Sequence, residues 1–408
     1  MRFTFLMIAL TLFSVSAVMG QSIFTLSEAV TLALNNNISL KKQQAAIKKA
    51  ESQLLQSGQF PNPLMSYSGE ILQGQGPGYE EWSISGSYPL NYFWERGTGI
   101  KASEKTIEAQ KLLLNHLLSE LTAKTVTVYS SHYIYQKLTQ RLDTIYIKVK
   151  ELSEAVRNRL KEGDISEYEM QRILIELQKI IAAKSDAASR KRQAGNELKL
   201  LTGKANPDII TTEKPFMRLP GYEGRDEAIL TGIEKRSDLA AAVIAAEGAE
   251  ADLSYNKLQS IPDILLSAGY KKQTGDLSGT VFSLDVEIPL FNRNQSGIQQ
   301  SETELSLLQS EIQYMKEKIR TEIADAFDEY LAANSLFTLH SQHDFRSLLT
   351  TILFSYESGE LSLVELTDGL RTCVEGLTEE ARLEGALYSS VYKLQQLSAA
   401  AIILSSEE

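Results

Sequence analysis

One pattern constrains the fold of this chain more than any other, because it occurs twice. An alternating stretch ends in Pro-Leu and a glycine-bearing turn, and a very long helical stretch follows. The first copy reads WSISGSYPLNYFWERG from Trp82 to Gly97, and the second reads FSLDVEIPLFNRNQSG from Phe282 to Gly297. Repetition at this distance indicates an internal duplication. The chain therefore consists of two related halves.

The two halves also open and close alike. The opening helix of the first half contains Asn-Ile-Ser-Leu from Asn37 to Leu40, and that of the second contains Arg-Ser-Asp-Leu from Arg236 to Leu239. Each half closes with a helix, a turn at Gly163 or Gly359, and a second helix. Each repeat is predicted to run helix, strand, loop, strand, long helix, turn, helix. We predict a first repeat over residues 21–202, a linker over 203–225 and a second repeat over 226–408.

Heptad spacing predicts that the long helices pack against other helices. The apolar positions are Leu138, Leu142, Ile145, Val149, Leu152 and Val156 in the first half, and Leu305, Leu308, Ile312, Met315, Ile319 and Ile323 in the second. No proline interrupts residues 101–162 or 299–357, so each is predicted as one helix of about 60 residues, roughly 90 Å long. Helices of this length are typical of coiled coils or tubes, while an ordinary helical bundle remains the alternative.

The strands alternate apolar and polar residues over about ten positions, the length that a tilted strand needs to cross a bilayer. The apolar set is Trp82, Ile84, Tyr88 and Leu90 in one half, and Phe282, Leu284, Val286, Ile288 and Leu290 in the other. Asp285 and Glu287 take the opposite face. A soluble sheet that packs on one side gives the same alternation. If the strands cross a membrane, four of them cannot close a barrel, and copies of the chain must assemble.

The N-terminus predicts export. Arg2 is followed by an apolar run from Phe3 to Val18 and then by small residues, so residues 1–20 are interpreted as a signal peptide. A transmembrane anchor is the alternative, but the run is shorter than the roughly 20 residues that a spanning helix needs. The only cysteine, Cys373, has no partner for an intramolecular disulfide, so packing or assembly must stabilise the exported chain.

Composition and motifs argue against several classes of function. Acidic residues outnumber basic ones by 52 to 41, which argues against a nucleic-acid partner. No glycine-rich phosphate loop or nucleophile motif is present, so we predict neither an enzyme nor a cofactor. His340 and His343 lie three residues apart, a spacing that suits a transition metal on a helix, but no third ligand accompanies them and no metal site is predicted.

From about Phe24 to Leu404 the sequence resembles the TolC-like outer-membrane efflux family, in the repeated helix openings, the Pro-Leu strand ends and the glycine turns. Short repeats without large insertions are similar to its heavy-metal efflux branch. The resemblance implies a homotrimer in the outer membrane, with a twelve-stranded β-barrel in the lipid and a helical tube in the periplasm. It also implies a periplasmic adaptor protein and an inner-membrane pump, for which the RND type is one candidate.

The second glycine turn carries the most specific part of this resemblance. Tyr356 to Asp368 matches Y-x-x-G-x-x-[ST]-x-x-[DE]-x-x-D, whose acidic residues line the periplasmic constriction in some members of the family. By that match, Glu365 and Asp368 are candidate pore-lining residues at the gate. A solvated acidic helix face is the alternative. The first turn differs from the pattern, because Glu169 is followed by Arg172 where the second acid would stand.

The patterns predict a mixed, mainly α fold with an internal duplication. The resemblance implies that its long helices form an α-barrel and that each protomer adds four strands to a trimeric transmembrane β-barrel. Asp285 and Glu287 are then candidates for the barrel lumen, and opening would separate the helix tips around Gly163 and Gly359. The predicted function is a passive duct across the outer membrane and periplasm, with lipid around the strands and no catalytic cycle. The alternative is a soluble periplasmic coiled-coil scaffold or adaptor protein.

Overall fold

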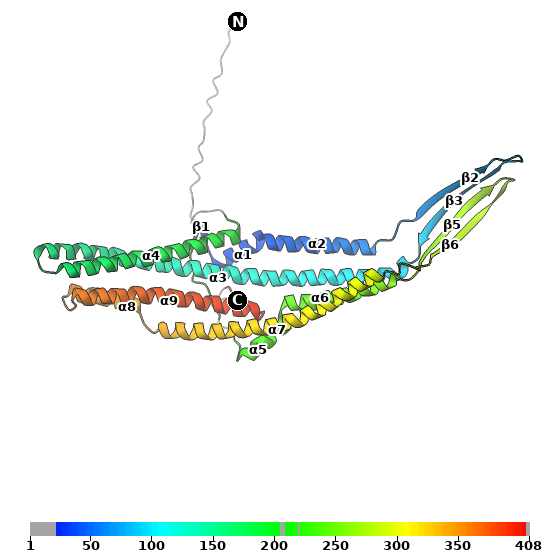
Figure 1. The fold of residues 1–408 in the computed structure, drawn as a ribbon. Coiled ribbons are helices and arrows are strands. Elements are labelled where there is room, and N and C mark those ends of the chain that lie inside the picture. Colours follow the sequence, from blue (N-terminus) through cyan, green and yellow to red (C-terminus); the bar gives the residue numbers. More distant parts are fainter. Residues whose placement is uncertain (1–21, 205–208, 219–220, 405–408) are drawn as a thin grey trace, which may run out of the picture.

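A computed structural model describes residues 22–204, 209–218 and 221–404 of an elongated molecule, with a four-stranded sheet at one end (Figure 1). The predicted signal peptide lies outside these residues. The elements in chain order are β1 (Ser22–Phe24), α1 (Leu26–Asn36), α2 (Ile38–Gly58), β2 (Leu64–Leu72), β3 (Tyr79–Pro89), α3 (Tyr92–Glu162), α4 (Glu167–Thr202), β4 (Ile209–Thr211), α5 (Arg225–Lys235), α6 (Ser237–Leu258), β5 (Asp263–Gln273), β6 (Leu277–Glu287), α7 (Gln295–His340), α8 (Phe345–Glu357) and α9 (Leu363–Leu397).

The predicted duplication is confirmed by the order of the elements and by a shared backbone detail. In each repeat the opening helix is broken at one residue, Asn37 between α1 and α2, and Arg236 between α5 and α6. These two residues have nearly the same extended backbone, with φ −65° and ψ 127° at Asn37 and φ −66° and ψ 121° at Arg236. The sequence motifs that open with these residues therefore mark the same bend in both halves.

The first long helix is confirmed and is longer than predicted. The 71 residues of α3 span about 107 Å at 1.5 Å per residue. Leu142, Ile145 and Val149 are at most 1 % exposed, as the heptad pattern requires. Gly163 ends the helix with a φ of 84°, and there a side chain would strain the backbone. Its N–H satisfies carbonyls of the last turn.

The prediction of one continuous second helix from residue 299 to 357 is wrong. Helix α7 ends at His340 and α8 begins at Phe345, with a short non-helical connection between them. Asp344 accounts for the restart, because its carboxylate accepts hydrogen bonds from the backbone N–H groups of Arg346 (3.0 Å) and Ser347 (3.2 Å). The absence of proline had indicated continuity, but a good N-cap residue begins a new helix without one.

A buried polar cluster joins α3 to β4. His132 is 2 % exposed, its Nδ1 lies 3.2 Å from the hydroxyl oxygen of Thr211, and Gly195 of α4 passes close to its ring. The side-chain amide of Gln136 donates to the carbonyl of Thr211 (2.9 Å) and accepts from its N–H (3.3 Å). Burial, together with the charges of nearby lysines, lowers the pKa of His132 to about 4.

This low pKa predicts a stability that depends on pH. The neutral imidazole is favoured in the folded state, so its contribution is fully present above the unfolded pKa of about 6.5 and is lost as pH falls toward 4. We expect up to about 3 kcal/mol to be lost over this window. Thermal unfolding followed by circular dichroism at pH 7 and pH 4.5 measures the loss. His132→Gln should flatten this dependence, whereas exposed His343→Gln should not; equal slopes in both variants would contradict the assignment.

Residues 211–218, here called the strap, are held to both halves by hydrogen bonds. On the first half, Gln136 pairs with Thr211, and the hydroxyl of Tyr129 lies 3.3 Å from the carbonyl oxygen of Glu213. On the second half, three side chains of α9 that lie about one helical turn apart donate hydrogen bonds to carbonyls of the strap. These bonds run from Tyr388 to Pro215 (3.0 Å), Tyr392 to Phe216 (2.8 Å) and Gln395 to Arg218 (3.0 Å). The strap therefore joins α3 to α9.

The four long strands form one antiparallel sheet in the order β2-β3-β5-β6. The two hairpins, one from each repeat, meet along the β3–β5 pair, in which Gly86 is opposite Ala268. Among the described strands, β2 and β6 each have one neighbour, so both outer edges of the sheet are unpaired within the chain. The helices follow the same order, because α2 packs on α3, α3 on α6, and α6 on α7.

Candidate functional site

The two glycine turns lie at the end of the molecule opposite the sheet (Figure 1). Gly163 connects α3 to α4, and Gly359, with a φ of 78°, lies between α8 and α9. No atom outside the local chain lies within 4 Å of the position that a Cβ would take at either glycine, so each is required for its backbone conformation and not for close packing. The helical tips are thus formed by two hairpins, one from each repeat.

The candidate gate residue Glu365 has a local structural role. It is the third residue of α9, and its carboxylate accepts hydrogen bonds from the backbone N–H (2.8 Å) and the hydroxyl (2.8 Å) of Ser362. The Ser362 hydroxyl in turn accepts from the Glu365 N–H, which completes a capping box. The bonds from Ser362 lower the pKa of Glu365, so its carboxylate is ionised at neutral pH. Ser166 and Glu169 form the same box at the start of α4.

Asp368, the second gate candidate, carries a counter-charge. It forms an ion pair with Arg371, one turn further along α9, and both side chains are about half exposed. Glu365 and Asp368 are three residues apart, so they share one helix face. Sequence reasoning missed Ser362 as the partner of Glu365 and Arg371 as the partner of Asp368. The Ser-x-x-Glu and Asp-x-x-Arg spacings can nevertheless be recognised in the chain. The tip therefore presents an ionised carboxylate at Glu365 and a carboxylate at Asp368 that is paired with an arginine.

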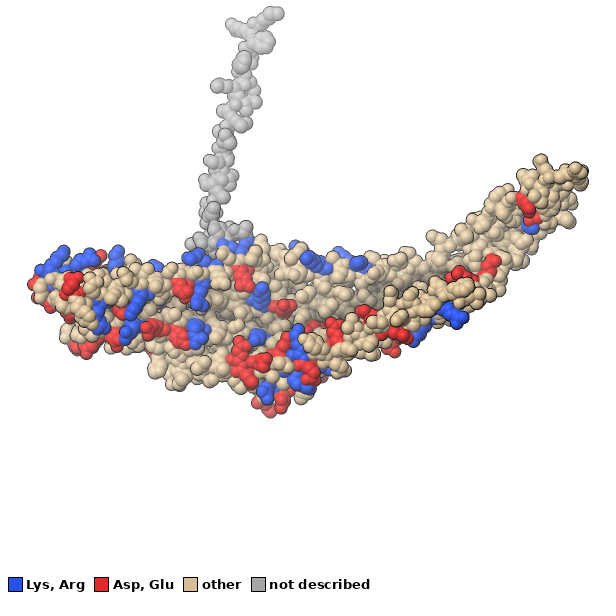
Figure 2. Space-filling model, in the orientation of Figure 1, with Lys and Arg blue, Asp and Glu red and all other residues tan. Residues whose placement is uncertain are grey.

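The sheet has one apolar and one polar face, as the alternation predicted. Cross-strand register places Tyr67 opposite Ile84, and Leu266 opposite Leu284, on the apolar face. On the polar face, serine hydroxyls pair across the strands, between Ser68 and Ser83 (2.8 Å) and between Ser87 and Ser267 (2.9 Å). Figure 2 shows that the arm carrying the sheet has few charged atoms on the face drawn, while the helical part is densely charged.

The candidate lumen residues Asp285 and Glu287 lie on the polar face of β6, and both are exposed. Asp285 accepts a hydrogen bond from the Ser283 hydroxyl (3.1 Å). Glu287 is opposite Asp263 of β5, and both line a polar pocket of about 270 Å³ between the sheet and the helices. Glu95 of α3 lines the same pocket, so carboxylates from three elements gather on this side of the junction.

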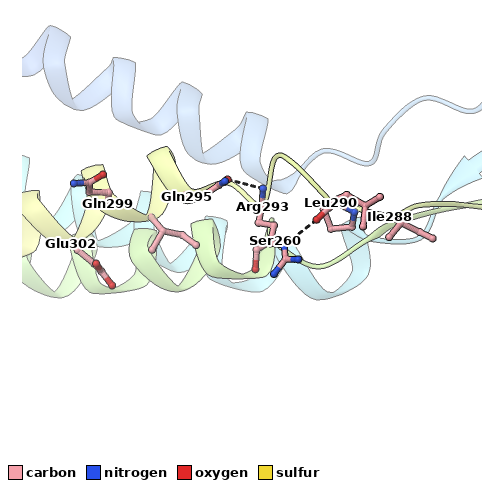
Figure 3. Close-up of a pocket in the computed structure, with 9 residues that line it drawn as sticks. Ser260, Ile288, Leu290, Arg293, Gln295, Gln299 and Glu302 are labelled. Atoms are coloured by element: carbon pink, nitrogen blue, oxygen red, sulfur yellow. Dashed lines mark hydrogen bonds between the residues drawn. The ribbon is translucent and has the colours of Figure 1, made fainter.

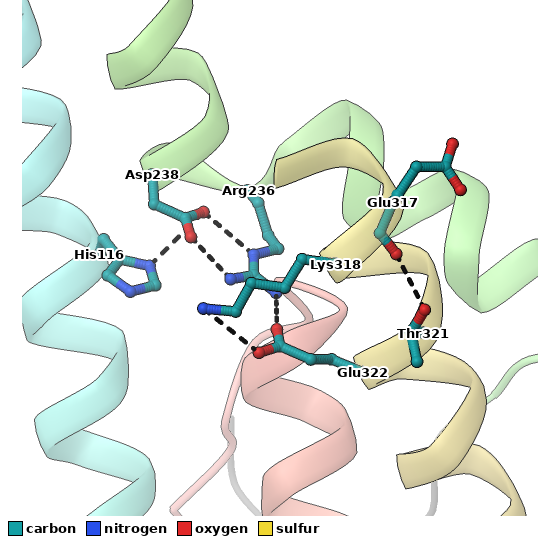
Figure 4. Close-up of polar contacts among 7 residues, drawn as sticks. All are labelled: His116, Arg236, Asp238, Glu317, Lys318, Thr321 and Glu322. Carbon is teal, nitrogen blue, oxygen red and sulfur yellow. Dashed lines mark hydrogen bonds and ion pairs between the residues drawn. The ribbon is translucent and has the colours of Figure 1, made fainter. Parts of the chain in front are cut away.

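A second charged cluster was missed by sequence reasoning and lies at the bend between α5 and α6 (Figure 4). Arg236, with a side chain 8 % exposed, donates to both carboxylate oxygens of Asp238 (3.0 and 2.6 Å) and to Glu322 of α7 (3.1 Å). Asp238 also lies 3.7 Å from His116 of α3. Burial acts to lower the pKa of Arg236, but the bonds and charges of its two acidic partners outweigh it and raise the pKa. The cluster links α3, α6 and α7 through His116, Asp238 and Glu322.

The remaining candidates have packing roles. Nε2 of His340 lies 3.0 Å from the carbonyl oxygen of Gly376, and its ring stacks on Phe345. His343 falls in the connection between α7 and α8. The interpretation that both histidines lie on one helix is therefore wrong. Within the described ranges, no three His, Cys, Asp or Glu side chains are grouped as metal ligands would be. Cys373 is fully buried in α9, and burial raises its pKa to about 11.

In the part of the chain that the structure describes, none of the helices has an apolar stretch long enough to cross a membrane.

An elongated chain with two helical hairpins at one end and a four-stranded sheet at the other has the fold of the TolC-like outer-membrane channels. The resemblance found in the sequence is confirmed. The solved channel CusC superimposes with a TM-score of 0.74 at 18% identity, over 92% of each chain. The CmeC outer-membrane channel of Campylobacter jejuni gives a TM-score of 0.73 at 15% identity, over 91% of this chain and 85% of that one.

The chain is also similar in sequence to a metal-resistance protein. The chain is 19% identical, over 91% of its length and 89% of the relative's, to the cobalt-zinc-cadmium resistance protein CzcC of Cupriavidus metallidurans. No protein-family model matches the chain. The similarity therefore extends over nearly the whole chain, although few residues are identical.

Proposed function

We propose that this protein is a passive outer-membrane channel of a tripartite efflux or export system. The sheet lies in the outer membrane and the helices extend into the periplasm, where they meet an adaptor protein and an inner-membrane pump, for which the RND type is one candidate. The pump supplies the energy, and the channel itself catalyses no reaction. Because one relative is a cobalt-zinc-cadmium resistance protein, divalent metal cations are the cargo that we propose.

The exposed apolar face of the sheet carries this proposal. Phe282 is 77 % exposed, Met65 72 %, Tyr67 71 % and Leu284 61 %, although all four are large apolar or aromatic side chains. A continuous surface of this kind is unfavourable in water and favourable in lipid. The opposite face, with its serines and carboxylates, suits a water-filled lumen. We therefore assign the apolar face to lipid, and Asp285 and Glu287 to the lumen.

The free edges of the sheet point to assembly. In lipid, the unpaired backbone groups of β2 and β6 need partners, because hydrocarbon offers no hydrogen bonds. Four strands cannot close a barrel, for which about eight is the minimum. Three copies joined β6 to β2 would close a barrel of twelve strands, and their helices would then surround a common tube.

At the tips, we propose that Glu365 and Asp368 line the constriction as rings of carboxylates, which favour cations and repel anions. Because Arg371 pairs with Asp368, Glu365 should contribute more of the selectivity. The cap does not conflict with this role, since a carboxylate that accepts two bonds from Ser362 keeps its negative charge.

We expect Glu365→Gln to reduce the preference for cations in single-channel recordings, and Asp368→Asn to reduce it less. Glutamine keeps the capping box, so the charge is lost without the roughly 1 kcal/mol that removing a cap costs. Arg371→Gln should raise the preference, because it releases the charge of Asp368. Glu311→Gln, at an exposed position on α7, is the matched control. If selectivity is the same in all four variants, the ring is not at this position.

Fractionation, detergent extraction and mass determination of the intact complex test the function as a whole. A trimer recovered only from the outer membrane is the expected result. The competing hypothesis is a soluble periplasmic coiled-coil scaffold or adaptor, which would be recovered as a soluble monomer or dimer. That result would require the apolar face of the sheet to be covered by another protein.

A further inference from the structure

A pocket of about 890 Å³ lies where β6 meets α7 (Figure 3). Its apolar part comes from Ile288 and Leu290, just beyond the end of β6, and these side chains are 70 % and 66 % exposed. Its polar part comes from Arg293, in the connection to α7, and from Gln299 in the second turn of that helix. The pocket thus combines an open apolar floor with a cationic end.

The pocket opens on the apolar side of the sheet. Ile288 continues the alternation of Leu284 and Val286, which are on the apolar face. The acidic pocket at the same junction is lined instead by Glu287 and Asp263, whose register places them on the polar face. The junction therefore has a cationic, apolar pocket on one side and an acidic, hydrophilic pocket on the other.

The guanidinium of Arg293 is positioned for a ligand. Its Nε donates to the carbonyl of Pro289 (3.1 Å), and its backbone N–H donates to the side chain of Gln295 (2.7 Å), so the residue is anchored at both ends. Within the described ranges no carboxylate forms an ion pair with Arg293, and the one acid that lines the pocket, Glu302, lies 3.8 Å from Lys257. A fixed guanidinium with free N–H groups matches the geometry of a phosphate.

The position of the pocket at the helical end of the sheet indicates the source of such a phosphate. Exposed aromatic residues mark this end of the sheet, among them Phe93 (64 %) and Phe291 (91 %). Aromatic side chains favour the headgroup level of a bilayer. We propose that this pocket binds a glycerophospholipid of the periplasmic leaflet, with its phosphodiester on Arg293 and an acyl chain along Ile288 and Leu290. This assignment rests on the proposed outer-membrane location.

The test is a titration of the purified, delipidated complex with dihexanoyl-phosphatidylglycerol, followed by native mass spectrometry. We expect about one bound lipid per chain, and about tenfold weaker binding by Arg293→Gln, as for the loss of a charge-assisted hydrogen bond. Arg320→Gln, which removes an exposed arginine paired with Glu317 on the same helix, should bind like the unaltered protein. Glycerophosphoglycerol, which lacks the acyl chains, and inorganic phosphate should bind far more weakly than the lipid.

The lipid site would be overturned if Arg293→Gln bound lipid as well as the unaltered protein, or if the deacylated headgroup bound as well as the lipid. It would also be overturned if Ile288→Cys formed a disulfide with a cysteine of a neighbouring copy and this disulfide prevented lipid binding. The last result would assign the pocket to the assembly contact. Location and mass are measured on the same preparations. A membrane trimer without bound lipid would contradict this inference alone, whereas a soluble monomer would contradict the proposed function as well.

Discussion

A chain with Arg236→Ala is expected to lose about 3 kcal/mol of stability. The substitution leaves the carboxylates of Asp238 and Glu322 without the cation that faces both, and Asp238 is largely buried. Breaking a buried ion pair by removing one partner costs 3 to 5 kcal/mol in general, and we expect the lower end because Glu322 is about one-third exposed. Thermal unfolding of the detergent-solubilised protein at neutral pH measures the effect.

Arg225→Ala provides the matched control. Arg225 lies 3.6 Å from Asp328 of α7, but both side chains are more than half exposed, so the pair contributes at most a few tenths of a kcal/mol. Similar melting temperatures for the two variants would show that the buried cluster does not hold α6 to α7.

A chain with Gly269→Ala is expected to form little of the trimer that we propose. Gly269 is opposite Ser85 where the two repeats meet in the sheet, and an added Cβ would overlap the carbonyl oxygen of Ile84 and lie 2.8 Å from the Cβ of Ser85. Because backbone atoms of β3 cannot move without breaking the ladder, we expect a cost of about 3 kcal/mol, the upper part of the range for overpacking. The fraction of complex that resists dissociation in unheated electrophoresis samples measures the loss.

Gly279→Ala is the control for replacing a strand glycine where an added Cβ meets no neighbouring atom. Gly279 lies on β6 opposite Lys271, and no atom lies within 4 Å of the Cβ position there. This variant should assemble like the unaltered chain. If both variants assemble fully, the close approach of β3 and β5 at Gly269 does not limit the sheet.

The sequence predicted most of the fold because its strongest patterns are local. Period-2 alternation placed Phe282 and Leu284 on one face and Asp285 on the other, and the structure has that arrangement. Heptad spacing likewise identified Leu142 and Ile145 as buried positions in α3. The helix openings at Asn37 and Arg236 were recognised because they repeat. Asn37 is a favoured N-cap residue and caps α2, but Arg236 makes no side-chain cap and gave no such signal of a break.

The remaining features depend on contacts between residues far apart in the chain. Arg236 meets Glu322 across 86 positions, and no local pattern connects them. The break before α8 depends on one capping residue, Asp344, in a stretch that otherwise favours a helix. The same reason explains why the site was predicted only in part, since spacing placed Glu365 and Asp368 on one face but did not reveal that Arg371 pairs with one of them.

The strap has a consequence for how the two repeats are connected. Its hydrogen bonds reach α3 through Gln136 and α9 through Tyr388 and Tyr392, so noncovalent contacts bind this segment to each repeat in addition to the peptide chain itself. A chain cleaved between α4 and β4 should therefore stay associated, and the two fragments, made separately, should recombine. By this view, two shorter polypeptides that pair as a dimer could have built the same architecture before their genes were fused.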